Sequence, residues 1–144
     1  MEQLPHTYNA TVSASPDDAV DITAEGLPGL RAAPPRQFGG PGGVWSPEDL
    51  LMASLSSCFV LSFRAIAKIN KLDWSALEVT ANGELDKVER VMKFTRVQIT
   101  ARLQVAAEVD RDKAERFLQK AEASCFVSNT LNCEIHLDCE INGT

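Results

Sequence analysis

Polar and apolar residues alternate in two short segments near the N-terminus. The alternation runs from His6 to Ala14 and again from Ala19 to Ala24, with the turn-prone segment Ser15 to Asp18 between them. An extended chain with this period of two presents its apolar side chains on one face, so the pattern predicts a β-hairpin. The segment Gly26 to Gly43 is rich in proline and glycine and is predicted to be a long loop. A loop of that length inside a compact domain usually has a functional or interfacial reason.

A long uncharged segment follows this loop. Ser46 to Asp49 is a strong helix start, because serine can cap, proline suits the first helical position and acids favour the positive end of the helix dipole. The fourteen residues Leu50 to Phe63 carry no charge, so a helix from Pro47 to about Asn70 would have to be buried all round. Fourteen uncharged residues are fewer than the roughly 20 that a bilayer needs. We therefore expect no membrane span. A monomer of 144 residues would struggle to enclose such a helix, so we expect an obligate homodimer with this helix near the interface.

The second half of the chain predicts three more strands and one more helix. These are, in order, Ala76 to Asp86, Met92 to Val105, Asp110 to about Ser124 and Cys133 to Ile141. The first two alternate and should pair as an antiparallel hairpin across the turn Lys87 to Arg90. The third is an amphipathic helix, and a short turn at Val127 to Leu131 precedes the last strand. This order of elements describes a single α+β domain, residues 1–144, without a parallel-sheet repeat.

Composition and charge narrow the range of functions. The chain is 44% hydrophobic and 24% charged, as in a packed globular protein. Its net charge of −6, without a stripe of Lys or Arg, argues against nucleic acid as a partner. The first ten residues lack the basic start and apolar run of a signal peptide, so we expect a cytoplasmic protein.

The four cysteines form no Cys-x-x-Cys pair, and in a cytoplasmic protein they are expected to be free or redox-active. Cys133 and Cys139 flank His136 in a Cys-x-x-His-x-x-Cys pattern. On an extended strand the two cysteines share one face and the histidine points to the other, so the three groups cannot converge on one metal ion. We assign both thiols to the core and expect no metal site.

Cys58 and Cys125 are the candidates for chemistry. Taken singly, each is more often a buried core residue than a catalyst. A nucleophilic thiol needs help, because an unperturbed pKa of about 8.5 leaves little thiolate at neutral pH. The position of Cys58 in the middle of its own helix denies it that helix's N-terminus, so a neighbouring arginine held by a carboxylate is the expected activator. The loop offers Arg31 and Arg36, and the helix start offers Glu48.

Two stretches of the chain resemble the signature of the OsmC/Ohr family. Phe38 to Cys58 contains a glycine-bearing loop, a Ser-Pro-Glu helix start and a cysteine ten residues after the glutamate. Ala123 to Leu131 contains a cysteine at the end of the following helix, with Ser-Asn close behind it and then a closing strand. Both stretches lie at the expected places, and the likeness as a whole spans nearly the whole chain.

The resemblance implies an α+β, OsmC-like intertwined homodimer in which antiparallel sheets wrap long central helices. It also implies a thiol peroxidase that needs no cofactor, in which Cys58 becomes a sulfenic acid and Cys125 resolves it to a disulfide. Dithiols, including protein-bound lipoyl groups, are the implied reductants. Arg36, with Glu48 as its partner, matches the family's activating arginine, and Arg31 is the alternative. Many family peroxidases have proline after the resolving cysteine, where this chain has Phe126.

Three functions are compatible with these residues to different degrees. The first is a peroxidase that reduces organic hydroperoxides and, less efficiently, hydrogen peroxide. The second is a non-catalytic dimer of the same fold that binds a small apolar ligand. The third, a cysteine-dependent acyl hydrolase, lacks a base, because His6 lies near the terminus and His136 on the last strand. We favour the peroxidase.

Overall fold

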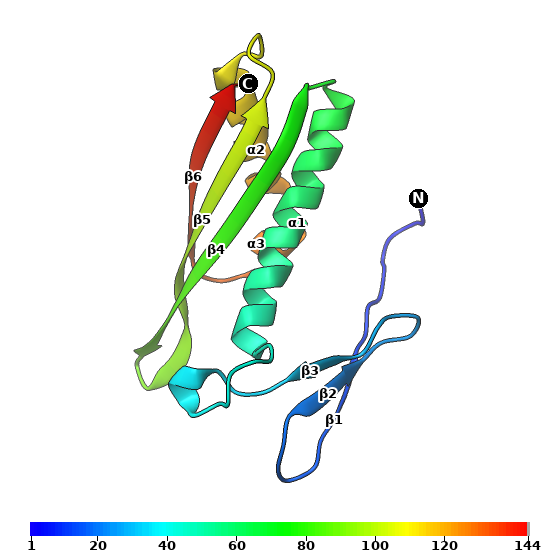
Figure 1. Ribbon diagram of the computed structural model, residues 1–144, viewed down its shortest axis with the longest axis vertical. Helices are drawn as coiled ribbons and strands as arrows, with labels where there is room; N and C mark the ends of the chain where they lie inside the picture. The colour runs from blue at the N-terminus through cyan, green and yellow to red at the C-terminus, as the bar shows by residue number, and fades with distance from the viewer. Residues whose placement is uncertain (144) are drawn as a thin grey trace. The chain divides into compact units, whose positions relative to one another are not determined.

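The structure, a computed structural model, describes residues 1–143. The chain divides into two compact units, Met1–Leu50 and Leu51–Thr144. The single domain expected over residues 1–144 stays a prediction. The first unit contains a three-stranded antiparallel sheet in the order β1-β2-β3 (Figure 1). Its strands are β1 (Thr11–Ser13), β2 (Val20–Thr23) and β3 (Leu30–Ala32).

The N-terminal hairpin is confirmed, although its first strand is shorter than predicted. The segment predicted as a loop is more structured than expected, because it contains β3 and the short 3-10 helix η1 (Arg36–Phe38). A three-residue strand is too short to show an alternation in sequence. The Ala33 N–H donates to the Trp45 carbonyl at 2.9 Å, which closes the rest of this segment into a loop. Glycine is required at Gly40, because a Cβ there would collide with the Pro34 carbonyl.

Helix α1 (Pro47–Ile69) has the predicted start and length. The Ser46 hydroxyl accepts from the Asp49 N–H at 3.1 Å and donates to the Asp49 carboxylate at 2.8 Å. That carboxylate in turn accepts the Ser46 N–H at 3.1 Å. These reciprocal bonds satisfy donors that a helix start leaves without an intrahelical partner.

A second three-stranded sheet, in the order β4-β5-β6, forms the frame of the second unit. Strands β4 (Trp74–Val88) and β5 (Val91–Val105) pair antiparallel, as predicted. Glu89 and Arg90 turn the chain between them with φ of 50° and 71°. Two consecutive positive φ values give the two-residue turn whose twist matches that of the strands.

Strand β6 (Glu134–Gly143) corrects one prediction about the sheet. It pairs with β5 in parallel, whereas the order of elements in the sequence had been taken to exclude a parallel repeat. The chain leaves β5, passes through α2 (Arg111–Ser124) and α3 (Phe126–Thr130), and returns to the end of the sheet where β5 began. A helical crossover of this kind makes the next strand parallel.

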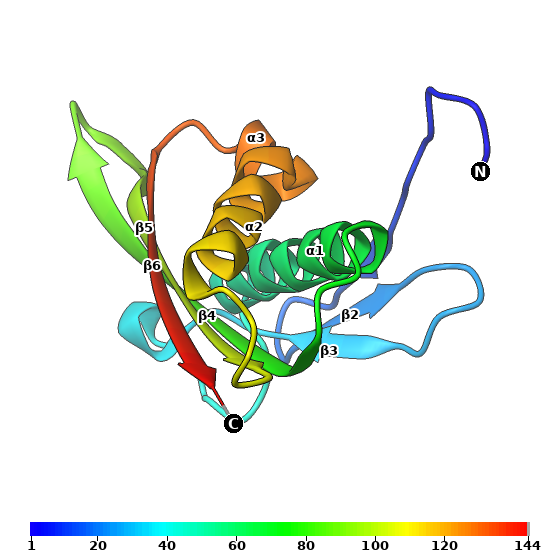
Figure 2. The ribbon, with the colours of Figure 1, turned by 90° about the horizontal axis from the view of Figure 1, so that it is seen from above.

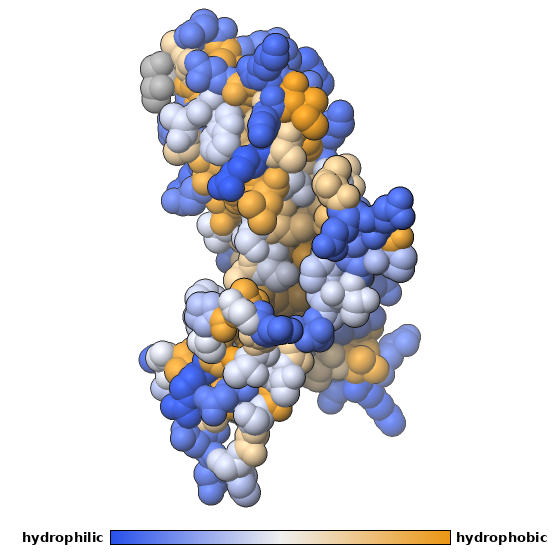
Figure 3. All heavy atoms as spheres, turned by 90° about the vertical axis from the view of Figure 1, so that its right-hand side faces the viewer, coloured by the Kyte–Doolittle hydropathy of each residue, from blue (hydrophilic) through white to orange (hydrophobic). Residues whose placement is uncertain are grey.

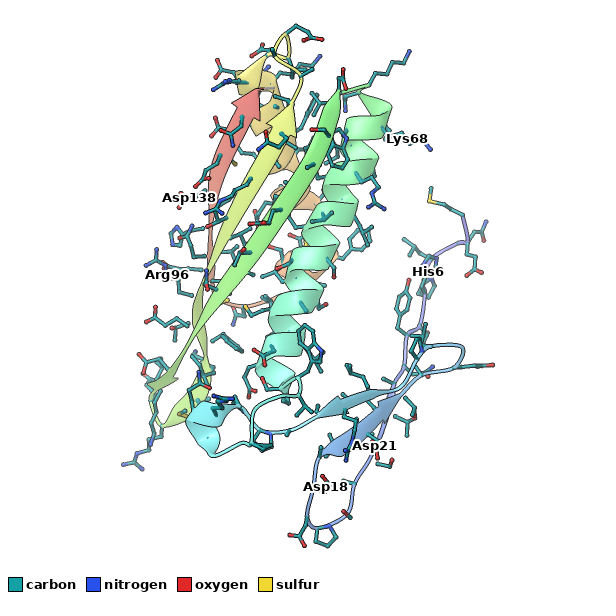
Figure 4. The ribbon with its side chains drawn as sticks, viewed as in Figure 1. His6, Asp18, Asp21, Lys68, Arg96 and Asp138 are labelled. Carbon is teal, nitrogen blue, oxygen red and sulfur yellow. The ribbon has the colours of Figure 1, made fainter. Side chains whose placement is uncertain are left out.

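One face of this sheet is covered by helices and the other is polar. Figure 2 shows α1 and α2 on the same side of β4, β5 and β6. Buried residues from β5, α1 and α2 form one apolar core between these layers. On the opposite face Arg102 pairs with Glu140 at 3.0 Å and Gln98 donates to Asp138 at 3.0 Å. Figure 4 shows Asp138 on the side of the sheet away from α1.

Within one chain, helix α1 is buried along one strip, and its burial all round, which was predicted for the dimer, stays a prediction. The buried residues are Leu55, Phe59, Phe63 and Ala67, spaced four apart. On other sides of the helix Leu61 is 56% exposed and Ile69 is 80% exposed, so one chain does not cover the helix completely. Apolar side chains reach the surface on this side of the molecule (Figure 3).

The length and composition of α1 would also allow it to cross a membrane. Its buried strip packs against the sheet of the same chain, which is the behaviour of a core helix in a folded domain.

Candidate active site

The second unit brings Cys58 and Cys125 into contact. Cys58 lies in the middle of α1 and is half-buried, and Cys125 is fully buried at the junction of α2 and α3. The two thiols lie close enough that each shifts the pKa of the other, and both cysteines are free. The extended backbone of Cys125, with φ −68° and ψ 118°, ends α2 and begins α3. We call residues 122–129 the α2–α3 elbow. Two thiols from distant parts of the sequence therefore form a reduced pair.

The surroundings of Cys58 favour its thiolate. Burial, the largest single influence, raises its pKa, but four hydrogen bonds act in the opposite direction. They come from the Val127 N–H, the Cys125 thiol, the Phe126 N–H and the Ser62 hydroxyl. Their combined effect lowers the Cys58 pKa below its ordinary value. Donors directed at the sulfur stabilise the charged form, so more of Cys58 is nucleophilic at neutral pH.

These donors differ from those expected for Cys58. The sequence suggested that only a neighbouring cation could replace the missing helix N-terminus. The structure places the first peptide N–H groups of another helix, α3, against the Cys58 sulfur. No sequence pattern links residues so far apart in the chain. Ser62 could have been found, since a side chain four residues further along a helix lies on the same face.

The pKa of Cys125 is shifted in the opposite direction from that of Cys58. Burial, the largest cause, acts together with hydrogen bonding and charge interaction with Cys58 to raise its pKa to about 11, against lowering effects from the Ser128 and Val127 N–H groups. Cys125 therefore stays protonated through the pH range in which Cys58 ionises. One thiol of the pair is suited to attack and the other to serve as a proton donor.

The α2–α3 elbow is fixed by the Ser-Asn pair singled out in the sequence. The buried Ser128 hydroxyl donates to the Glu122 carboxylate at 2.5 Å, and the Asn129 side chain donates to the Ala123 carbonyl at 3.2 Å. Both bonds tie the start of α3 back to the end of α2. They hold Cys125 and the Phe126 N–H in place.

Glu48, Arg36 and Arg31 all belong to the first unit. Glu48 lies in the first turn of α1, and its buried Oε2 has no hydrogen-bond partner among residues 1–143. A buried carboxylate oxygen of this kind needs a donor. The Arg36 guanidinium lies so close to Gly42 that a Cβ there would collide with it. The roles expected for Glu48 and Arg36 stay predictions.

Arg31, the alternative to Arg36, is engaged on the exposed face of the N-terminal sheet. Its guanidinium lies 3.2 Å from the Asp18 carboxylate and 3.3 Å from that of Asp21. These pairs raise the pKa of Arg31, chiefly through the hydrogen bond to Asp18. Figure 4 labels both aspartates. An arginine with two carboxylate partners of its own is less suited to activate a thiol than Arg36, so Arg36 remains the preferred candidate.

The other two cysteines face the core, as predicted. Cys139 packs against the core from β6 and Cys133 does so from the residue before it, and burial, the largest cause, raises the pKa of Cys139 to about 11. The exposed His136 is directed away from that face and lies 3.6 Å from Glu134. Among residues 1–143 the structure shows no group of three or more potential metal ligands.

The site thus consists of a pair of free thiols with opposed pKa shifts, one on the long helix α1 and one at the α2–α3 elbow. The family model described as "OsmC-like protein" matches residues 40–140. The chain therefore belongs to the OsmC-like protein family, as its sequence suggested.

Individual relatives are more distant. The chain is 28% identical over 90 residues to an uncharacterized protein of Methanocaldococcus jannaschii, covering 62% of this chain and 46% of that protein. It is 29% identical over 96 residues to the peroxiredoxin OsmC of Escherichia coli, covering 67% of this chain and 66% of that protein. The matched segment thus spans about half to two thirds of the length of these curated relatives.

Solved structures share the fold. An OsmC-like protein of unknown function from Vibrio cholerae matches with a TM-score of 0.87 and 19% identity, covering 94% of this chain and 99% of that one. An organic hydroperoxide resistance protein from Legionella pneumophila matches with a TM-score of 0.76 and 26% identity, covering 97% of this chain and 99% of that one. The α+β architecture, with its long helix and two sheets, is therefore that of the OsmC/Ohr proteins.

Proposed function

We propose that this protein is a cysteine-based peroxidase that reduces organic hydroperoxides and, less efficiently, hydrogen peroxide. The observation that carries the proposal is the contact between a half-buried Cys58 with a lowered pKa and a buried Cys125 with a raised one. The names of the relatives, a peroxiredoxin and an organic hydroperoxide resistance protein, support the same reaction class.

The proposed reaction has three steps. The Cys58 thiolate attacks the terminal oxygen of the hydroperoxide, the O–O bond breaks, and the alkoxide takes up a proton and leaves as the alcohol. Cys58 is now a sulfenic acid. The Cys125 sulfur, losing its proton, attacks the Cys58 sulfur, which forms a disulfide and releases water. An external dithiol then reduces the disulfide to two thiols and becomes a disulfide itself.

The remaining roles belong to the same proposal. Arg36 would assist the Cys58 thiolate and the peroxide oxygen, and Glu48 would hold the guanidinium in place. The buried, unsatisfied Glu48 oxygen supports this assignment, because it needs a donor. A small dithiol or a protein-bound lipoyl group would be the reductant.

Oxidation by a stoichiometric amount of peroxide tests the proposal. The protein is treated with one equivalent of cumene hydroperoxide and digested, and its peptides are mapped by mass spectrometry. We expect a Cys58–Cys125 disulfide, which dithiol reverses. In Cys125→Ser we expect a sulfenic acid at Cys58 that dimedone traps. If both thiols of the wild-type protein stay free while peroxide persists, the non-catalytic ligand-binding dimer is the better description.

We further propose that the chain works as a homodimer whose partner covers the exposed apolar side of α1. Leu61→Glu would place a carboxylate in that interface and is expected to weaken the dimer at least about 100-fold. Lys120→Glu puts the same group on an exposed position of α2, away from α1, and should leave assembly unchanged. Sedimentation equilibrium at several concentrations measures both. A monomeric wild-type protein would contradict the proposal.

A further inference from the structure

Helix α3, which follows Cys125, is too short to be stable by itself. It has five residues, and an isolated helix of that length is marginal in water. Among residues 1–143, two side-chain hydrogen bonds join it to α2. One runs from the Ser128 hydroxyl to the Glu122 carboxylate at 2.5 Å, and the other from the Asn129 amide to the Ala123 carbonyl at 3.2 Å. The position of α3, and of the cysteine that joins it to α2, therefore depends on these bonds.

The bond between Ser128 and Glu122 is expected to be the stronger of the two. Ser128 is only 6% exposed, whereas Asn129 is exposed to solvent. A hydrogen bond to a carboxylate is charge-assisted, and it is strengthened further where water is excluded. Without this acceptor the buried hydroxyl would be left unsatisfied, which costs more than the loss of an exposed bond. The Ser128–Glu122 bond should therefore dominate the stability of the α2–α3 elbow.

This bond closes the α2–α3 elbow across Cys125. Glu122 lies three residues before Cys125 and Ser128 three residues after it. The backbone of Cys125 is held from both sides as well, because its N–H donates to the Glu122 carbonyl at 3.2 Å and its carbonyl accepts from the Asn129 N–H at 3.0 Å. The buried Cys125 side chain belongs to the core against which Cys58 packs. A change in the bend of the α2–α3 elbow would therefore move the Cys125 sulfur relative to Cys58.

We propose that Glu122 and Ser128 are positioning residues, whose hydrogen bond holds the Cys125 sulfur where it can attack the oxidised Cys58. This inference rests on the peroxidase function proposed above and concerns one step of it, the closure of the disulfide. In that step the Cys125 sulfur attacks the Cys58 sulfur, and the departing hydroxyl group takes the Cys125 proton and leaves as water. Neither positioning residue takes part in the attack of Cys58 on the peroxide, so that earlier step should not depend on their bond.

A set of variants tests whether the two side chains act through one bond. Ser128→Ala and Glu122→Ala each remove one end of the bond, and the double variant removes both. Glu122→Gln keeps an oxygen that can accept from Ser128, so it should close the disulfide faster than Glu122→Ala. Ser124→Ala is the matched control, because the Ser124 hydroxyl donates to the Lys120 carbonyl at 2.8 Å within α2 and does not join α2 to α3. Circular dichroism establishes that each variant is folded.

The two chemical steps are timed separately after rapid mixing with one equivalent of cumene hydroperoxide. Samples are quenched with dimedone or an alkylating reagent, and mass spectrometry follows the sulfenic acid at Cys58 and the disulfide. Ser128→Ala and Glu122→Ala should each slow closure about tenfold, because reacting atoms tolerate little displacement, and should leave the attack on peroxide within about twofold of wild type. The double variant should be no slower than either single variant. Ser124→Ala should keep both rates.

Amide hydrogen exchange gives a second measurement that needs no peroxide. The Cys125 and Asn129 N–H groups are both hydrogen-bonded within the α2–α3 elbow. Local opening exposes such groups to exchange. Loss of the Ser128–Glu122 bond should therefore speed their exchange about tenfold in the two alanine variants. Exchange in Ser124→Ala should stay at the wild-type rate.

Unchanged closure in both Ser128→Ala and Glu122→Ala would overturn the proposal. Additive effects in the double variant would do the same, and so would equal slowing of both chemical steps, which indicates a general loss of structure. Diamide, which oxidises two thiols to a disulfide without a peroxide, separates this inference from the proposed activity. If the wild-type protein closes the disulfide with diamide but not with cumene hydroperoxide, the peroxidase proposal is lost. The rates of the same variants with diamide then decide this one.

Discussion

Replacing Cys58 with serine is expected to abolish hydroperoxide consumption, with a loss of roughly 10³-fold or more. The serine hydroxyl has nearly the same size and can accept the same hydrogen bonds, but it is not ionised at neutral pH and cannot form a sulfenic acid. The assay follows the disappearance of tert-butyl hydroperoxide with a dithiol in excess. The rate for Cys58→Ser should equal that of the dithiol alone.

Cys133→Ser is the matched control for this prediction. It makes the same substitution at a half-buried cysteine that packs against the core just before β6. We expect it to keep most of the activity, with a small loss of stability from placing a hydroxyl among apolar neighbours. If Cys58→Ser stayed active and Cys133→Ser did not, the assignment of the nucleophile would be wrong.

Local patterns in the sequence predicted most of the fold, and long-range pairing accounts for the errors. The capped start of α1 and the alternation of β4 and β5 depend on near neighbours, and both were located to within a few residues. The parallel pairing of β6 depends on the path of the chain through α2 and α3, which no local period records. Strand β3 is too short to carry a period at all.

The candidate site shows the same contrast between what the sequence predicts and what only the fold determines. The sequence singled out Cys58 and Cys125, and the structure brings their thiols into contact. It could not predict the Phe126 and Val127 N–H groups as donors, because peptide groups are identical in every residue and only the fold decides where they point. The burial that raises the Cys125 pKa also arises only from packing in the folded chain. The sequence therefore identified the two candidate sulfur atoms, and the structure identified the groups that shift their pKa values.

Phe63→Ala is expected to reduce the free energy of unfolding by about 3–5 kcal/mol. Phe63 is completely buried on the core strip of α1. Its ring meets that of Trp74 edge to face, with centroids 5.4 Å apart at 77°. Truncation removes this aromatic pair and leaves a cavity between the helix and the start of β4. Urea unfolding at one fixed protein concentration measures the loss, because assembly would make stability depend on concentration.

Two further variants identify the cause of that loss. Phe63→Leu keeps most of the buried volume and should cost less than about 1.5 kcal/mol. Arg64→Ala changes the next, exposed residue of the same helix and should stay within about 0.5 kcal/mol of the wild-type protein. If Phe63→Ala were no more destabilising than Arg64→Ala, α1 would not be packed on the sheet through this face. The packing of α1 on the sheet that places Cys58 next to the α2–α3 elbow would then have to be different.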